Sequence, residues 1–329
     1  MTAAPHQPLP RTEHPRATRR SVLRAGVALA VTGGLLTAGQ PPRSEGPAGL
    51  LRIATGEESG FYRAFGQLLA AELRAAYPRL DAVALVTEAS VANLEMLEAG
   101  TADLALVLAD IAGTALGGTA PFGHRIELRA LGRVYENYLQ LAVRADSPVT
   151  TVADLAGRTV SLGAARSGGA VLGDRVLAAA GVTATIRHLS MAAARDALKT
   201  GAIDAMLVSG GVPLPVLSTL DSEVGIRLVP LAPYLPALHG FGYEAVRVPA
   251  GAYRSPEVDT IGVASLLVCR PDLPTPVAAA VTRVLVQQAS RLVPAQTVAI
   301  QFLDVRSLIG TGSVPLHPGA VATYRALHG

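Results

Sequence analysis

The sequence predicts an α/β fold of two similar lobes, each a βαβ-type sheet flanked by helices, with a ligand cleft between the lobes. Three observations predict this fold. An internal duplication recurs about 100 residues along the chain, each copy carries a glycine-rich loop after its first strand, and two long apolar segments connect the copies. A chain of 329 residues, half of them apolar, is long enough for two such lobes.

The duplication is clearest in a motif of helix, glycine, aspartate and strand. Residues 93–107 (NLEMLEAGTADLALV) match residues 195–208 (RDALKTGAIDAMLV). In each copy a helical pattern ends at a glycine, Gly100 or Gly201, and an aspartate then opens an apolar run. Glycine is the usual residue in the left-handed conformation that ends a helix, and a short apolar run is typical of a buried strand.

Upstream of this motif both copies share one order of elements: a strand, a glycine-rich loop, a helix and a second strand. We name residues 51–107 the first copy and residues 159–208 the second copy, and we expect parallel strands in both. The expected elements are a strand at 51–55, a loop at 56–60, a helix through Leu73 and a strand at 82–87, and in the second copy a strand at 159–162, a loop at 163–169, a helix through Ala180 and a strand at 184–189.

Two apolar, extended segments, 131–144 and 258–270, are expected to cross between the lobes. The Pro-rich segment 230–256 is expected to be an ordered surface loop. The predicted organisation is an export signal and linker at 1–43, lobe 1 at 44–142 and 258–329, and an inserted lobe 2 at 143–257.

The N-terminal residues predict export from the cytoplasm. Arg19 and Arg20 precede an apolar stretch of 14 residues, 25–38, which is too short to span a membrane. This pattern is typical of a cleaved twin-arginine signal, although an amphipathic or disordered tail is the alternative. No cysteine follows the apolar stretch, so a lipid anchor is not expected there.

The charge outside this leader argues against a nucleic-acid partner. Residues 1–43 hold six of the 28 basic residues and one of the 25 acidic residues, so 22 basic and 24 acidic residues remain. A nearly neutral body lacks the excess of positive charge that binds a phosphate backbone. We therefore expect a small solute as the ligand.

The two glycine-rich loops are the expected ligand-binding elements. Loop one (residues 55–62) and loop two (residues 163–169) each join a strand to a helix, and N–H groups at a helix N-terminus favour an anion. The side chains of Tyr62, Arg166 and Ser167 are expected to add hydrogen bonds. Either loop alone could also be only a tight turn.

Further along the chain, Ser90 is expected to cap a helix or to contact the ligand. Tyr135, with Glu136 and Tyr138, is expected where the first crossing segment passes the cleft.

Enzyme chemistry has little support in the sequence. The single cysteine, Cys269, lies in an apolar run and is expected in the core, and the seven histidines show no metal-ligand spacing. The main alternative is a serine hydrolase in which Ser167 is the nucleophile and His239, His317 or His328 is the base. We expect no enzyme activity, no metal and no cofactor.

Across residues 50–329 the sequence resembles the TAXI family of solute receptors for TRAP-type transporters. The resemblance lies in the order of several motifs along the chain rather than in any one of them. The matching positions are Thr55, Gly56, Gly60 and Tyr62 in loop one, then Thr87, Ser90, Asn93 and Leu94, then Tyr135 and Glu136, then residues 154–160, and finally residues 315–320 with Tyr324.

The resemblance implies a type II periplasmic binding protein-like fold and a receptor that passes a small organic anion, such as an acidic amino acid or a dicarboxylate, to a membrane permease. His317 is expected to organise a C-terminal turn. With the loop residues, the implied ligand-binding set is Thr55, Gly56, Ser59, Gly60, Tyr62, Ser90, Asn93, Tyr135, Arg166, Ser167 and Gly168.

Two departures from the family pattern bear on the ligand. Loop one carries Glu57 and Glu58 where the family has Gly and Thr, and loop two carries Arg166 where Gly is usual. Arg166 could hold a ligand carboxylate or pair with Glu57 across the closed cleft. A zwitterionic solute would suit both changes, and a cation could bind near Glu57 and Glu58. A binding protein for an ABC importer and a sensory receptor are the alternatives within this fold.

Overall fold

The computed structural model describes residues 46–294, 303 and 305–328, and these residues belong to one compact unit. The predicted export signal lies outside the described residues. Within the described part of the chain, no helix has the length and apolar character needed to cross a membrane.

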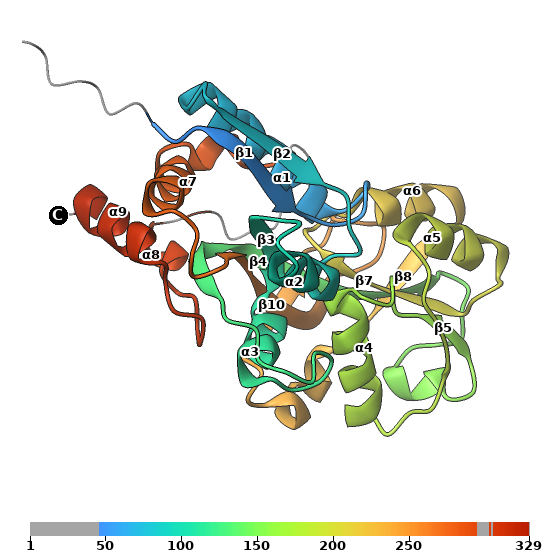
Figure 1. Cartoon of the computed structure of the whole chain (residues 1–329). Coiled ribbons are helices and arrows are strands. Elements are labelled where there is room, and N and C mark those ends of the chain that lie inside the picture. Colours follow the sequence, from blue (N-terminus) through green and yellow to red (C-terminus); the bar gives the residue numbers. More distant parts are fainter. Residues whose placement is uncertain (1–45, 295–302, 304, 329) are drawn as a thin grey trace, which may run out of the picture. The chain divides into compact units, whose positions relative to one another are not determined.

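Both copies fold as three parallel strands with the same order, in which the first strand lies between the second and the third. In the first copy the order is β2-β1-β3, and in the second copy it is β6-β5-β7. Figure 1 shows β1 and β2 with α1 in blue, and β5 with α4 in green. The predicted βαβ-type copies are therefore confirmed. The strands are β1 (Gly49–Ala54), β2 (Leu80–Leu85), β3 (Leu104–Leu108), β5 (Thr159–Ser161), β6 (Thr185–Arg187) and β7 (Ala205–Gly210).

Two long antiparallel strands, β4 (Arg129–Arg144) and β10 (Val258–Cys269), join the copies into one sheet of the order β2-β1-β3-β10-β4-β7-β5-β6. These strands are the two predicted crossing segments. Strands from both predicted lobes belong to this one sheet, so the sheet does not mark where one lobe ends and the other begins. The lobe boundaries stay a prediction.

The Pro-rich segment 230–256 is more ordered than a surface loop, so that expectation was wrong. It contains the strand β9 (Glu244–Val248), which pairs with β10, and a short 3-10 helix, η2 (Ala232–Leu238). A further strand, β8 (Ile226–Val229), pairs with β4. Proline elsewhere in the segment did not prevent strand formation, because β9 itself contains none.

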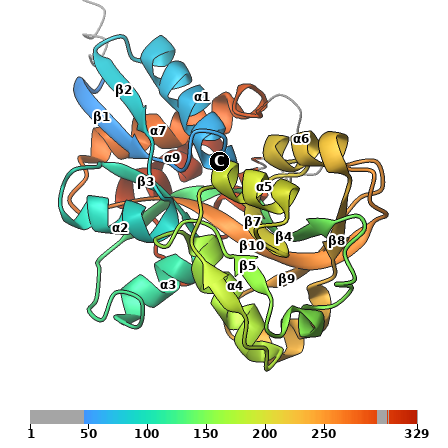
Figure 2. The same cartoon turned by 90° about the vertical axis from the view of Figure 1, so that its right-hand side faces the viewer.

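Helices cover the sheet. Figure 2 shows α5 beside α6, and α7 packs against both α1 and α9. The helices are α1 (Phe61–Ala76), α2 (Ser90–Glu98), α3 (Ala109–Gly117), α4 (Gly168–Ala179), α5 (Met191–Thr200), α6 (Pro215–Val224), α7 (Thr275–Gln287), α8 (Val305–Leu308) and α9 (Pro318–His328), and the other short 3-10 helices are η1 (Val152–Leu155) and η3 (Ala289–Arg291).

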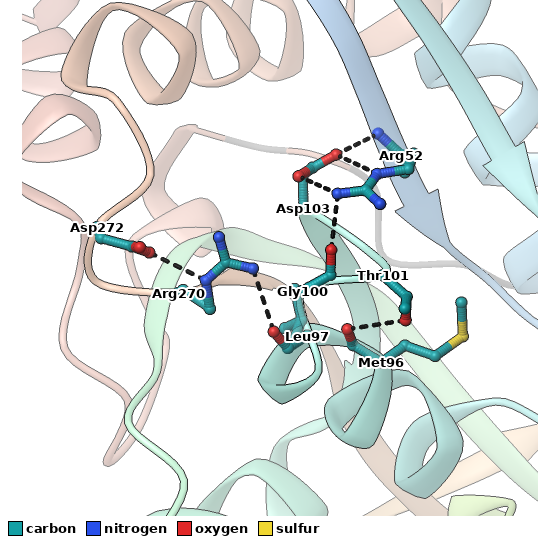
Figure 3. Close-up of polar contacts among 8 residues, drawn as sticks. All are labelled: Arg52, Met96, Leu97, Gly100, Thr101, Asp103, Arg270 and Asp272. Atoms are coloured by element: carbon teal, nitrogen blue, oxygen red, sulfur yellow. Dashed lines mark hydrogen bonds and ion pairs between the residues drawn. The ribbon is translucent and has the colours of Figure 1, made fainter.

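The aspartate of the duplicated motif ties the start of β3 to β1 (Figure 3). One carboxylate oxygen of Asp103 accepts the backbone N–H of Arg52 at 2.8 Å, and the guanidinium of Arg52 donates to both carboxylate oxygens at 3.0 Å. The same guanidinium donates to the carbonyl of Gly100 at 2.8 Å. Gly100 has the expected left-handed conformation, with φ at 69°.

The second copy repeats this arrangement. The carboxylate of Asp204 accepts the backbone N–H of Thr159 at 2.9 Å and pairs with Arg158 at 3.2 Å. Gly201 ends α5 in the left-handed conformation, with φ at 76°. The spacing of glycine and aspartate therefore has one structural cause in both copies: the glycine ends the helix, and the aspartate joins the first and third strands.

The C-terminal motif also folds as expected. The backbone N–H of His317 donates to the carbonyl of Ala130 at 2.8 Å, and its Nδ1 accepts the N–H of Gly319 at 3.0 Å. Cys269 is fully buried, and burial raises the pKa of its thiol to about 12. Both residues hold structure: the histidine organises a turn, and the cysteine fills the core.

Candidate ligand-binding site

A cavity lies where the two copies meet, with about 640 Å³ of empty space, part of which is open to solvent. Both glycine-rich loops contribute to its lining, as do the starts of α1, α2 and α4. Of the predicted binding residues, those that line the cavity are Gly56, Gly60, Tyr62, Ser90, Ser167 and Gly168.

A buried polar cluster contributes to the cavity from the central sheet. Asn137 on β4 donates from Nδ2 to the hydroxyl of Ser265 on β10 at 2.7 Å and to the hydroxyl of Tyr62 at 3.4 Å. Tyr62 and Asn137 both line the cavity. Burial raises the pKa of Tyr62, so its hydroxyl stays neutral and can hydrogen-bond a solute without adding charge.

Ser90 holds the start of α2 against β3. Its hydroxyl accepts the backbone N–H of Leu108 at 3.1 Å, and the residue that caps the helix is Ala89, at a positive φ of 78°. The expected capping role of Ser90 is therefore wrong. Its side chain joins the end of β3 to α2 instead, and it remains on the cavity wall.

The start of α4 approaches α2 closely, and a glycine permits this. A Cβ atom on Gly168 would lie 2.7 Å from Cδ1 of Leu108 and 2.8 Å from the hydroxyl of Ser90. Such distances are well inside van der Waals contact, so a side chain at this position would push the copies apart.

Ser167 caps α4, and its hydroxyl accepts the N–H of Ala170 at 3.0 Å. Of the proposed bases, His317 belongs to the C-terminal turn, and Nδ1 of His239 contacts the carbonyl of Pro236 at 3.0 Å. The side chain of His328 lies outside the described residues. Ser167 and these two histidines thus each bond to residues of their own turn or helix start, and none of these bonds joins the serine to a histidine.

The charges around the cavity are acidic. Glu57 and Glu88 line it, and none of the described lining residues is a lysine, arginine or histidine. The pKa of Glu57 is raised because the carboxyl is partly buried, and because the charge of Glu88 adds to this effect. Glu58 lies apart from them: its side chain is 71% exposed and pairs with Arg63.

Metal ligation has no cluster to support it in the described chain. No three side chains of His, Cys, Asp or Glu come together there in a way that would hold a metal ion.

Comparison with known proteins identifies the family, because the model of the NMT1-like family matches residues 53–326. The chain belongs to the NMT1-like family. Among solved structures it is similar to MatC from Rhodopseudomonas palustris with bound malate, at 15% identity and a TM-score of 0.52, covering 74% of this chain and 86% of that one.

It is also similar to the periplasmic aliphatic sulphonate binding protein SsuA from Escherichia coli, at 19% identity and a TM-score of 0.45, covering 85% of this chain and 83% of that one. The predicted two-lobed α/β fold of periplasmic binding proteins is shown for this NMT1-like protein.

Several predicted binding residues of this NMT1-like protein lie outside the cavity lining. Asn93 is fully buried, and its Nδ2 donates to the carbonyls of Thr55 at 2.6 Å and Leu106 at 2.7 Å. Thr55 is fully buried as well. Tyr135 is buried with its ring 4.5 Å from that of Phe61, and Phe61 itself lines the cavity. These buried residues pack against the strands and side chains that form the cavity wall, and they do not line the cavity themselves.

Ser59, at the tip of loop one, is exposed.

Arg166 does not pair with Glu57, so that expectation was wrong. Its guanidinium pairs with Glu95 on α2, and its backbone N–H donates to Glu88 at 3.2 Å. The carboxylate of Glu57 instead accepts the backbone N–H of Met191 at 2.7 Å. The pairing differs because Glu95 lies on α2, beside loop two, whereas the carboxylate of Glu57 in loop one is bound to the start of α5.

Sequence reasoning missed Asn137, Glu88 and Met191 as cavity residues. Asn137 directly follows the Tyr135–Glu136 motif on a strand whose alternation places it on the cavity side, and this alternation was a usable signal. Glu88 and Met191 come after strands in both copies, and their side chains reach the cavity only because α2 and α5 start there.

Proposed function

We propose that this NMT1-like protein is an extracytoplasmic receptor that captures one small polar solute and delivers it to a membrane permease. The observation that carries the proposal is the cavity itself, which both copies line at the carboxyl ends of β3, β5 and β7. In open α/β sheets this edge is where ligands bind. The loop contacts between Glu57 and Met191, and between Arg166 and α2, support closure around the solute.

The permease that we propose as partner is of the TRAP type. The order of TAXI-like motifs over residues 50–329 supports this assignment. An ABC importer as partner and a sensory role are the alternatives. Co-reconstitution in vesicles with a TRAP-type permease, and a test of receptor-dependent uptake, would check the transport role.

Export by a twin-arginine signal is part of the same proposal. Arg19 and Arg20 carry it, and their replacement by lysine is expected to leave the chain in the cytoplasm.

Thermal unfolding of the chain with a panel of solutes tests the receptor role directly. The panel holds amino acids, dicarboxylates, keto acids, sulfonates and neutral solutes. A solute present at a hundred times its dissociation constant stabilises the folded state by about 2.7 kcal/mol, which raises the melting temperature visibly. A panel without any raised melting temperature, repeated after refolding to remove carried-over solute, would contradict the receptor role.

A separate assay tests the hydrolase alternative. The capping hydrogen bond of Ser167 supports inertness toward nitrophenyl esters and fluorophosphonate probes. Covalent labelling of Ser167 by such a probe would contradict this expectation.

A further inference from the structure

We propose that Glu57 and Glu88 form a subsite that binds a positively charged amino group of the solute. The proposal rests on the receptor role proposed above and names the chemistry of its ligand. The solute it implies is a primary ammonium on a compact apolar body.

The first argument is that Glu57 and Glu88 both line the cavity and that neither has a counterion in the described chain. One oxygen of Glu57 accepts the N–H of Met191 at 2.7 Å, and one oxygen of Glu88 accepts the N–H of Arg166 at 3.2 Å. Within the described residues neither carboxylate forms an ion pair. Glu57 is partly buried and Glu88 is exposed. Two like charges repel each other, and a cation between them removes that repulsion.

The second argument is an acceptor of another kind on the same cavity wall. Asn137 is 2% exposed and lines the cavity. The hydrogen bonds that it makes in the described chain, to Ser265 and to Tyr62, both use Nδ2. Its Oδ1 therefore remains as an acceptor. An ammonium group offers three donors and no acceptor, so it matches a cavity rich in acceptors.

The third argument is that the N–H donors at the start of α2, and the arginine of loop two, are already paired. The N–H groups of Val91 and Ala92 at the start of α2 donate to the carbonyl of Arg166 at 3.1 and 3.2 Å. Loop two thus occupies the α2 terminus, and the guanidinium of Arg166 pairs with Glu95 outside the cavity lining.

The rest of the cavity lining indicates which kind of group the solute carries besides its ammonium. Much of the wall is apolar, with Phe61, Leu108, Leu162, Met191 and Leu207 contributing side chains. Such a wall favours a hydrocarbon body over a second charged group.

The experiment is calorimetric titration of the full chain with matched solutes. Each set holds an amino acid, the carboxylic acid that lacks its amino group, and the amine that lacks its carboxyl group, for example L-leucine, 4-methylpentanoate and 3-methylbutylamine. Malate and glutamate complete the panel. We expect binding by ammonium-bearing members and at least about 100-fold weaker binding by their ammonium-free partners, since two charge-assisted contacts are lost.

Three variants identify the residues responsible. Glu57→Gln and Glu88→Gln remove one charge each and keep an oxygen for the N–H that the residue accepts. Each is expected to weaken binding of the ammonium-bearing solute about 10–100-fold. Glu58→Gln is the matched control, because that side chain is exposed and paired with Arg63. We expect it to change the affinity less than about twofold.

Different failures have different meanings. Tighter binding by an ammonium-free anion than by its amine partner would overturn the subsite and leave the receptor role standing. Unchanged affinity in both folded glutamine variants would do the same. A panel with no binding at all, amines and anions alike, would contradict the receptor role and the subsite together.

Discussion

The carboxylate of Asp110 on α3 lies against the guanidinium of Arg175 on α4, and the hydroxyl of Tyr243 bonds to both. The side chain of Asp110 is fully buried, and the guanidinium also lies 4.0 Å from the ring centre of Phe241. α3 follows the first copy and α4 belongs to the second. This ion pair therefore joins the two copies on a buried path separate from the cavity loops.

Removing one partner of this pair is expected to be costly. Arg175→Met leaves the Asp110 carboxylate buried without its counterion, which lowers the free energy of unfolding by about 3–5 kcal/mol. The double variant Arg175→Met, Asp110→Leu removes both charges and is expected to regain most of that loss. Urea unfolding at pH 7 measures both values. Arg125→Met is the control, because Arg125 pairs with Glu127 on the surface, and it should change stability by less than about 1 kcal/mol. Equal losses in the single and double variants would contradict the argument.

A second prediction concerns pH. Glu136 is 1% exposed, and burial raises its pKa to about 7, against the opposing charge of Arg133 and with a small addition from Glu244. Between pH 4.5 and 7 the folded state therefore holds a proton that the unfolded state has released, so stability falls as pH rises through this window.

Glu136→Gln removes this dependence. Relative to the natural chain, the variant is expected to gain about 3 kcal/mol in unfolding free energy between pH 4.5 and pH 8. Urea unfolding at the two pH values measures the gain. Glu127→Gln, at an exposed carboxylate, should show no such gain. A Glu136→Gln difference that stays constant with pH would show that the folded pKa is not raised.

Much of the fold could be predicted from the sequence, because local patterns and the duplication agree. The helix and strand of each copy follow from apolar periodicity, and the glycine and aspartate of the motif have the same role twice. The strand β9 could not be predicted, because β10 pairs with it only in the folded chain. Its own residues alternate weakly, and its neighbours are rich in Pro and Gly.

The site was predictable in part, for a different reason. A glycine-rich loop between a strand and a helix can be recognised in the sequence, so Gly60 and Gly168 line the cavity as expected. Side-chain direction decides the rest. Asn93 turns inward to two strand carbonyls, and Arg166 turns outward to Glu95. Neither direction is encoded in residue type or spacing.

The position of Asn93 leads to a third prediction. Asn93→Ala leaves the carbonyls of Thr55 and Leu106 without their donor in a buried site, which costs about 1–3 kcal/mol for each. The free energy of unfolding should therefore fall with no solute present, and urea unfolding measures this fall. A variant as stable as the natural chain that nevertheless lost solute binding would instead make Asn93 a ligand contact, as the family resemblance implies.

The last prediction uses two adjacent glycines at the start of α4. Alanine restricts the unfolded chain more than glycine does, so Gly169→Ala should raise the free energy of unfolding by about 0.4–1 kcal/mol, since its Cβ would meet its nearest neighbour, Ser209, at an ordinary 3.5 Å. Gly168→Ala has the same benefit in the unfolded state. Its Cβ, however, would lie 2.7 Å from Leu108 and 2.8 Å from Ser90, so the packing of α4 on α2 must give way at a cost of about 1–3 kcal/mol. Urea unfolding of the two variants should give changes of opposite sign. Changes of the same sign would mean that α2 and α4 do not approach each other as closely as these distances require.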